Sequence, residues 1–239
     1  MPSLQNKELK MKLIEDGTFD EFLKEKEALH KLGIEDLFDA DYYIGWNEEE
    51  LKACFQLAHM RYTRRTRINK WFDFWLKDKT KQLFFLTFTF NKKAMCDSFR
   101  NRQQYVYRNI KDFDDYIVNV DYGDHTNREH FHAVVVMDPE AEEFMNWKYS
   151  KRKKRWYCND CELFNDKKGE VDIEKVMGDP IKLKKYQAKL TSHAMKNNCT
   201  KLGFKRNSVY QSYTKYMKET NKLLKGKSYL KRHSSTPAC

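Results

Sequence analysis

The stretch "VDYGDHTNREHFHAVVV", residues 120–136, decides the fold of this chain. A β-rich run enters it from Asp115, a turn-forming "GDHTN" follows, and a second β-rich run leaves it towards Met137. Two such runs joined by a short polar turn predict an antiparallel hairpin. Side chains two apart on a strand share a face, so His130 and His132 point to one side while Phe131 points into the core.

Further strands and helices are predicted on both sides of this hairpin. "LFFLTFTF" at 83–90 alternates aromatic and aliphatic residues on one face with Thr87 and Thr89 on the other, which is typical of a half-buried strand, and "GEVDIEKV" at 169–176 predicts another. A helix is indicated over 92–110, and a long helix capped by Asn47 precedes the first strand. We therefore expect an α+β fold, an antiparallel sheet flanked by helices, with a helical N-terminal extension.

Composition and length limit the class of protein. The chain has 239 residues, of which 40% are hydrophobic and 34% charged, with only 8 glycines and 4 prolines. These values indicate a globular protein with long charged helices, and they exclude a disordered chain. The sequence contains no apolar run of about 18 residues and no apolar signal-peptide core at its start. We expect no membrane partner, a cytoplasmic location, and six scattered cysteines that stay reduced.

Charge is distributed unevenly along the chain. The net charge is +11, but residues 1–50 carry 14 acidic and 6 basic side chains, whereas residues 181–239 carry 15 basic and 1 acidic side chains. A segment so basic repels itself unless a polyanion is near, and a phosphate backbone is the usual partner. A solvated lysine-rich tail is the alternative from composition alone.

The paired histidines are candidate metal ligands. Asp121 ends the strand before the hairpin turn, close enough to add a carboxylate to His130 and His132. Two imidazoles and one carboxylate form a facial site with open positions, which is what catalysis at a metal needs. Without the carboxylate, a His-x-His pair is more often surface histidine than ligand.

The segment after Pro180 predicts a helix that carries a nucleophile. Tyr186, Lys189 and His193 stand at helical spacing and so share one face of it. A phenol surrounded by lysines is suited to meet a phosphate as a nucleophile. The flanking lysines are Lys182, Lys184 and Lys185.

Three motifs, in order, carry a resemblance to a known family. They are "FLTFTF" at 85–90, "DYGDHTNREHFH" at 121–132 and "YQAK" at 186–189. Their order and spacing resemble the His-hydrophobe-His (HUH) endonucleases, and within them the rolling-circle replication initiator (Rep) proteins of small phages, single-stranded DNA viruses and plasmids. The resemblance covers roughly residues 83–197.

The resemblance implies a role for each matching residue. His130, His132 and Asp121 would hold Mn²⁺ or Mg²⁺, Tyr186 would be the nucleophile, and Lys189 would help to position phosphate or metal. The family often has Glu at the acidic position, and many relatives repeat a Tyr where this chain has Leu190, so it looks like a one-tyrosine enzyme. We expect DNA contacts from seven residues: Thr87, Thr89, Lys182, Lys185, Arg61, Arg64 and Arg65.

The function implied is replication initiation by nicking and rejoining single-stranded or hairpin origin DNA through a covalent 5′-phosphotyrosine link. The core implied is RRM-like. The sequence shows no Gly-x-x-x-x-Gly-Lys loop, so a host or otherwise separate helicase, together with a polymerase, would complete replication in the cytoplasm of a bacterial host. The expected divisions are an extension with an arginine-bearing helix at 1–80, the catalytic domain at 81–200, and a basic C-terminal helical region at 201–239.

Several alternatives stay open from the sequence. A non-catalytic nucleic-acid-binding module would use Phe84, Phe88, Tyr105 and Tyr107 for stacking or core packing. A one-tyrosine transposase or relaxase would share the chemistry. A structural zinc site is possible on Cys158 and Cys161, joined by Cys199 or His125 only if the fold brings them near. Tyr210 is a reserve nucleophile.

Overall fold

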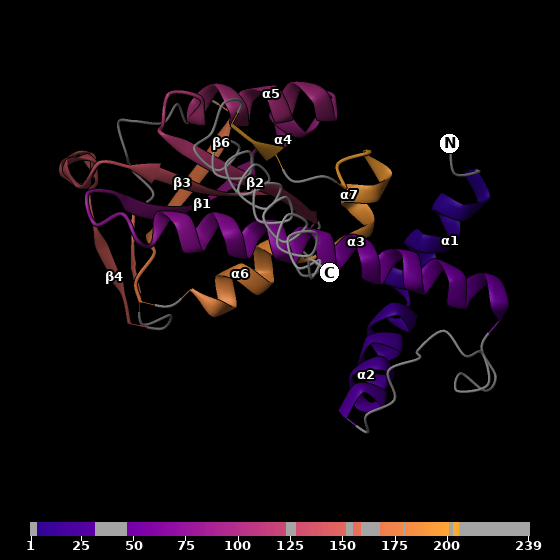
Figure 1. Ribbon diagram of the computed structural model, residues 1–239. Coiled ribbons are helices and arrows are strands. Elements are labelled where there is room, and N and C mark those ends of the chain that lie inside the picture. Colours follow the sequence, from indigo (N-terminus) through magenta and orange to yellow (C-terminus); the bar gives the residue numbers. More distant parts are fainter. Residues whose placement is uncertain are drawn as a thin grey trace, which may run out of the picture.

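The computed structural model describes residues 4–31, 47–122, 128–151, 155–158, 168–178, 180–200 and 203–205 (Figure 1). The expected basic C-terminal helical region beyond residue 205, with Tyr210, lies outside the described residues. So do Cys161 and His125.

An antiparallel sheet forms the centre of the fold. Among the described residues its strands are β1 (Gln82–Phe90), β2 (Asp115–Tyr122), β3 (Glu129–Met137), β6 (Gly169–Lys175) and the short β7 (Gly203–Phe204). They pair in the order β6-β1-β3-β2-β7, and every pair is antiparallel. The predicted α+β class is confirmed, and β2 and β3 form the predicted hairpin.

Helices cover both faces of this sheet (Figure 1). On one face α4 (Lys92–Met95) and α5 (Phe99–Ile110) pack over the buried aromatic and aliphatic side chains of β1 and β3. On the other face α3 (Glu48–Trp75) and α6 (Ile181–Ala188) enclose a second cluster. The helix predicted over 92–110 is interrupted, because Ser98 caps a new helix by accepting a hydrogen bond from the Asn101 backbone N–H.

The N-terminal helices pack against the rest of the protein. Helices α1 (Leu4–Glu15) and α2 (Thr18–Lys31) share an apolar cluster with α3 and with α7 (Ser192–Lys196). Leu13 and Phe22 of this cluster are at most 1% exposed, and Met195 of α7 is 5% exposed. A division at residue 80 would separate α3 from the sheet that it covers, so packing is continuous across the expected boundary.

The segment after Pro180 forms two helices instead of the single one expected. Helix α6 ends at Ala188, Lys189 has an extended backbone, and Thr191 caps α7 by accepting a hydrogen bond from the Ala194 N–H. Thr191 also donates to the Val120 carbonyl, which ties the break to β2. Tyr186 and Lys189 are therefore not on one helix face, and contacts with the sheet determine where each points.

A small hairpin stands apart from the main sheet. Strands β4 (Lys148–Ser150) and β5 (Arg155–Tyr157) follow a short 3₁₀ helix at Pro139–Phe144 and pair with each other. The segment "NWKYSKRKKRWY" at 146–157, which contains both strands, is rich in basic residues. No helix in the described ranges is long and apolar enough to cross a membrane.

A buried carboxylate joins α3 to the start of β2. Asp115 is fully buried, and its Oδ2 accepts hydrogen bonds of 3.0 Å from the indole N–H groups of both Trp71 and Trp75. Burial raises the pKa of Asp115 above its ordinary 3.8, although these indoles and the Tyr116 N–H pull it down. The contact therefore holds the long helix on the sheet at an electrostatic cost.

Replacement of this carboxylate should lower stability in a pH-dependent way. Asp115→Ala is expected to lower the free energy of unfolding by about 3 kcal/mol, since two buried indole donors lose their acceptor. Because the folded pKa is raised, the contribution of Asp115 is fully present below its unfolded pKa and falls as pH rises through the folded pKa. Urea denaturation should thus show a larger gap between wild type and variant at about pH 4 than at about pH 7. An equal or larger gap at the higher pH contradicts this assignment.

Candidate active site

The register of three strands assembles the candidate site. His132 of β3 lies opposite Thr87 of β1 and Asn119 of β2, and His130 lies opposite Thr89 and Asp121. The two imidazole rings stack with centroids 5.9 Å apart. Because neighbouring positions across an antiparallel sheet share a face, the predicted histidines, threonines and carboxylate meet on one patch of the sheet.

The threonines hold the histidine rings in place. The Thr87 hydroxyl is 3.3 Å from His132 Nδ1, and the Thr89 hydroxyl is 3.0 Å from His130 Nδ1. Each contact uses Nδ1, the ring nitrogen nearer the backbone, and support of this kind orients metal-binding imidazoles. Thr87 and Thr89 are themselves partly exposed, and the DNA-contacting role expected for them stays a prediction.

Burial keeps both imidazoles neutral. It lowers the pKa of His132 to about 3, with smaller contributions from His130 and Lys189. Burial also lowers the pKa of His130, against the opposing charge of Asp121. Neutral imidazole is the form that accepts a hydrogen bond or binds a metal, so the pair is ready for either at neutral pH.

Tyr186 lies directly over His132. Its hydroxyl oxygen is 2.7 Å from His132 Nε2, and the two ring centroids are 4.9 Å apart in an edge-on arrangement. Phe85 of β1 stacks on His132 and meets Tyr186 edge-on, while the Gln187 side chain donates to the His132 carbonyl. Tyr186 was predicted from the sequence as a site residue, but Phe85 was not. Only Thr87 and Thr89 had been identified on that face of β1.

Asp121 is turned towards Lys189 in this structure. The Lys189 Nζ to Asp121 Oδ2 distance is 3.4 Å, and the Asp121 Oδ1 accepts from the Tyr122 N–H. Within the described residues no three His, Cys, Asp or Glu side chains are grouped as metal ligands. The donor set still fits a divalent ion chemically, because two neutral imidazoles and a carboxylate lie on adjacent strands; Asp121 would exchange Lys189 for the ion.

A cleft of about 810 Å³ opens beside these residues. Its basic lining residues come from α3, α6 and the segment after α6, and α1 and α2 also contribute to the lining. Of the residues predicted for the site, the cleft is lined by Arg61, Asp121, Lys182, Lys185, Tyr186 and Lys189. Tyr122 and His193 also line it, and so do Ile14, Glu15, Phe19 and Asp20 of the N-terminal extension.

The predicted DNA-contacting arginines of α3 have three different environments. Arg61 lines the cleft and lies 3.7 Å from Asp20, whereas Arg65 is exposed in a separate groove beside α2. Arg64 is only 4% exposed and lies inside the protein. The expectation that Arg64 meets DNA is thus replaced by a structural role.

Arg64 fixes the end of α6 to the sheet. Its guanidinium donates to the carbonyls of Gln187, Ala188, Lys189 and Thr200 and, at 2.7 Å, to the Asn119 side chain. Burial lowers the pKa of Arg64 to about 10, so it stays charged at neutral pH. A charged fork of donors can satisfy the carbonyls that a helix C-terminus leaves without partners, and α6 therefore ends where Arg64 reaches it.

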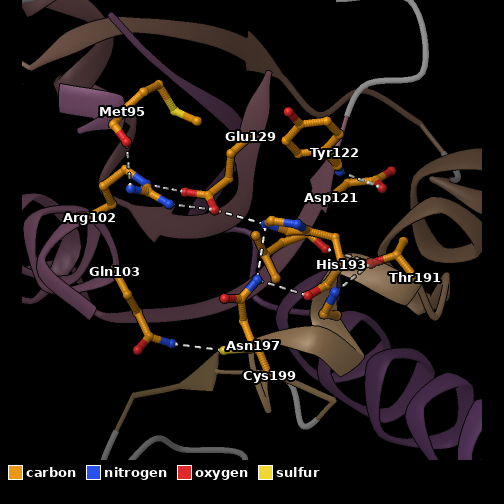
Figure 2. Close-up of polar contacts among 12 residues, drawn as sticks. Met95, Arg102, Gln103, Asp121, Tyr122, Glu129, Thr191, His193, Asn197 and Cys199 are labelled. Atoms are coloured by element: carbon orange, nitrogen blue, oxygen red, sulfur yellow. Dashed lines mark hydrogen bonds and ion pairs between the residues drawn. The ribbon is translucent and has the colours of Figure 1, made fainter. Parts of the chain in front are cut away.

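His193 lines the cleft and contacts the buried Arg102–Glu129 ion pair (Figure 2). Its Nε2 is 2.8 Å from the Glu129 carboxylate, which also accepts a two-pronged contact from Arg102. Burial pushes the pKa of Glu129 up, but the hydrogen bonds from His193 and Arg102 outweigh it and hold that pKa below its ordinary value. Tyr122 packs over His193 at 5.1 Å between ring centroids. This network locks α5, β3 and α7 together next to the metal-ligand candidates.

The other candidates from the sequence receive different positions. Cys158 is buried in the core, and Cys199 accepts a hydrogen bond from Gln103. The aromatic residues Phe84 and Phe88 are at most 1% exposed under α5 and serve as core residues, so they do not form a stacking surface.

Comparison of the chain with protein-family models, with curated proteins and with solved structures found no match. The geometry of the site and the chemistry of its residues therefore carry the functional argument.

The anchoring role of Arg64 predicts a large loss of stability on its removal. Arg64→Ala should lower the free energy of unfolding by about 3 kcal/mol, because several buried carbonyls and Asn119 lose a charged donor. The matched control is Arg65→Ala, one residue along the same helix but exposed, which should change it by less than about 0.5 kcal/mol. Denaturant titrations measure both values, and similar effects of the two variants would rule out the anchor.

Proposed function

We propose that this protein nicks and rejoins single-stranded DNA through a covalent 5′-phosphotyrosine link on Tyr186. The observation that carries the proposal is the 2.7 Å contact between the Tyr186 hydroxyl and His132 Nε2 at the edge of a basic cleft. At this place a tyrosine that could act as a nucleophile lies next to two neutral imidazoles. The lysines of the cleft, which would attract phosphate, are close by. This is the constellation on which the resemblance to HUH endonucleases rests.

Tyr186 performs the bond exchange. Its oxygen attacks phosphorus, a P–O bond to the phenol forms, and the bond from phosphorus to the 3′ oxygen breaks. The phenol releases a proton to solvent and the departing 3′ oxygen takes one up, so the step is balanced. The link conserves the phosphodiester's energy, and a 3′-hydroxyl can attack it later and restore the strand without ATP.

The lysines of the cleft supply positive charge where the phosphate would lie. Lys182, Lys185 and Lys189 are all exposed on the cleft side of the Tyr186 segment. Their charges favour entry of the strand and the negative charge that builds on the phosphoryl oxygens. Lys189 also holds Asp121 at 3.4 Å, which keeps the third candidate ligand next to the histidines.

His130, His132 and Asp121 would hold Mn²⁺ or Mg²⁺, which when bound polarises the scissile phosphate. His132 Nε2 contacts the Tyr186 hydroxyl here, and one nitrogen lone pair cannot serve both partners. The described arrangement is therefore a resting one, in which His132 keeps the phenol in place. For that nitrogen to hold an ion, Tyr186 would have to give up this contact, and its hydroxyl would then be available to a phosphate in the cleft that Tyr186 lines.

The biological role that fits this chemistry is replication initiation at an origin. A strand that has to reach a sheet-face site between helices is single-stranded or extruded from a hairpin, because a stacked duplex does not bend its backbone so far. Unwinding and synthesis are assigned to a separate helicase and polymerase, in the cytoplasm of a bacterial host. A one-tyrosine transposase or relaxase would use the same chemistry.

Strand cleavage should depend on Tyr186 and not on its neighbour Tyr122. Both tyrosines line the cleft and both are 38% exposed, so Tyr122→Phe is a matched control for Tyr186→Phe. With Mn²⁺ and a pool of end-labelled hairpin oligonucleotides, wild type and Tyr122→Phe should release a shortened labelled fragment and transfer it to an added 3′-hydroxyl acceptor. Tyr186→Phe should lower cleavage by at least about a thousandfold, because the variant lacks the hydroxyl proposed to attack phosphorus. Equal cleavage by the two variants contradicts the assignment.

Metal binding should respond to the competition at His132. By calorimetry, His130→Ala and His132→Ala should weaken Mn²⁺ binding by at least about tenfold, while the exposed His59→Ala should not change it. Tyr186→Phe should strengthen binding by about fivefold, because it removes a hydrogen bond from the ligand nitrogen. If Mn²⁺ affinity is the same in all four variants, the assignment of the metal site to these histidines is wrong.

A further inference from the structure

The β4–β5 hairpin carries an aromatic pair that the fold does not cover. Tyr149 and Trp156 lie directly opposite each other in the register, with ring centroids 5.3 Å apart and a tilt of 56°. They are 50% and 57% exposed. Large aromatic side chains in such a pair, open to water on a two-stranded element, mark a binding surface more often than a structural one.

The base of the hairpin is anchored, so this exposure is not due to a loose element. Trp147, just before β4, stacks on Phe84 with ring centroids 6.3 Å apart. Cys158, just after β5, is fully buried and exchanges two backbone hydrogen bonds of 2.9 and 2.8 Å with Ile173 of β6. Aromatic packing thus takes place at the base, while Tyr149 and Trp156 contribute little to the core.

The hairpin is also strongly basic. Between residues 146 and 158 the sequence has six basic side chains and no acidic one: Lys148, Lys151, Arg152, Lys153, Lys154 and Arg155. Lys148 and Lys151 are exposed. Exposed lysines and uncovered rings on the same hairpin call for a partner that offers both negative charge and flat apolar faces.

Single-stranded nucleic acid is the partner that has both. Its phosphates match the lysines and arginines, and its unstacked bases can lie on aromatic rings. A duplex keeps its base faces stacked inside and offers the rings little to contact. We propose that the β4–β5 hairpin is a binding site for single-stranded DNA in which bases stack on Tyr149 and Trp156.

This site is separate from the chemistry at Tyr186. Binding at the hairpin needs neither the histidines nor a metal. The binding of single-stranded DNA at the hairpin does not depend on the proposed function. Only the further statement that the bound strand is the one cut at Tyr186 rests on it. The experiment is therefore made in Tyr186→Phe without metal, so that loss of binding and loss of cleavage are observed separately.

The first test compares affinities for a fluorescent oligothymidine of about 20 nucleotides, long enough for several bases to stack. In the Tyr186→Phe background, replacing both Tyr149 and Trp156 by Ala should weaken binding about tenfold or more. Tyr62→Ala, which removes an aromatic that is 69% exposed on α3, is the matched control and should leave affinity unchanged. The slope of log affinity against log salt concentration should stay the same in the aromatic variant, because no cation is removed. It should become shallower by about 1.4 in Lys148→Gln/Lys151→Gln, which removes two cations.

The second test does not depend on how any substitution folds. An oligonucleotide with 5-iododeoxyuridine is photo-crosslinked to the otherwise unaltered chain, and the adduct is mapped by peptide mass. Crosslinks on Tyr149 or Trp156 are expected. Crosslinks only elsewhere, together with affinity unchanged within about twofold in the aromatic variant, overturn the proposal. So does binding of anionic phospholipid vesicles that requires Trp156 when the oligonucleotide does not bind, since the hairpin would then be a membrane contact.

Discussion

The buried guanidinium of Arg64 is the interaction on which the site depends. It reaches from the long helix α3 to the carbonyls at the end of α6 and to Asn119 of β2, the residue opposite His132. These contacts end α6 at Ala188 and fix Tyr186 on the sheet, where its hydroxyl meets His132. A positive charge inside the protein thus positions Tyr186, the proposed nucleophile, whereas the lysines proposed to attract DNA lie in the cleft.

In the candidate site, Tyr186 and Lys189 occupy the same atoms of His132 and Asp121 that a metal ion would use. His132 Nε2 contacts Tyr186, and Asp121 contacts Lys189, so each of these two candidate ligands has a partner within the protein that a metal ion would displace. Burial keeps His132 neutral, which suits it to exchange a hydroxyl for a metal ion. The same two exchanges would release the phenol and the ammonium group of Lys189 towards a phosphate in the cleft. Assembly of the metal site and exposure of the nucleophile would then be a single event.

Much of this arrangement could be predicted from the sequence, and the reasons are physical. The period-2 pattern of β1 and the β-rich run of β3 predicted these strands, and the two-residue spacing of His130 and His132 predicted their common face. The break after α6 could not be predicted, because it depends on Arg64, more than a hundred residues earlier, reaching that helix end. The contribution of the N-terminal extension to the cleft could not be predicted for a similar reason. Phe19 and Asp20 line the cleft together with Arg61 only because the fold brings these distant segments together.

The identity of the residue joined to DNA tests the central claim most directly. Wild-type protein is incubated with Mn²⁺ and single-stranded hairpin DNA, denatured, treated with nuclease and digested, and the peptide carrying the remaining nucleotide is sequenced by mass spectrometry. The account predicts a phosphodiester-linked nucleotide on Tyr186. A link on Tyr122, on a tyrosine beyond residue 205, or strand cleavage with no linked peptide at all would contradict it.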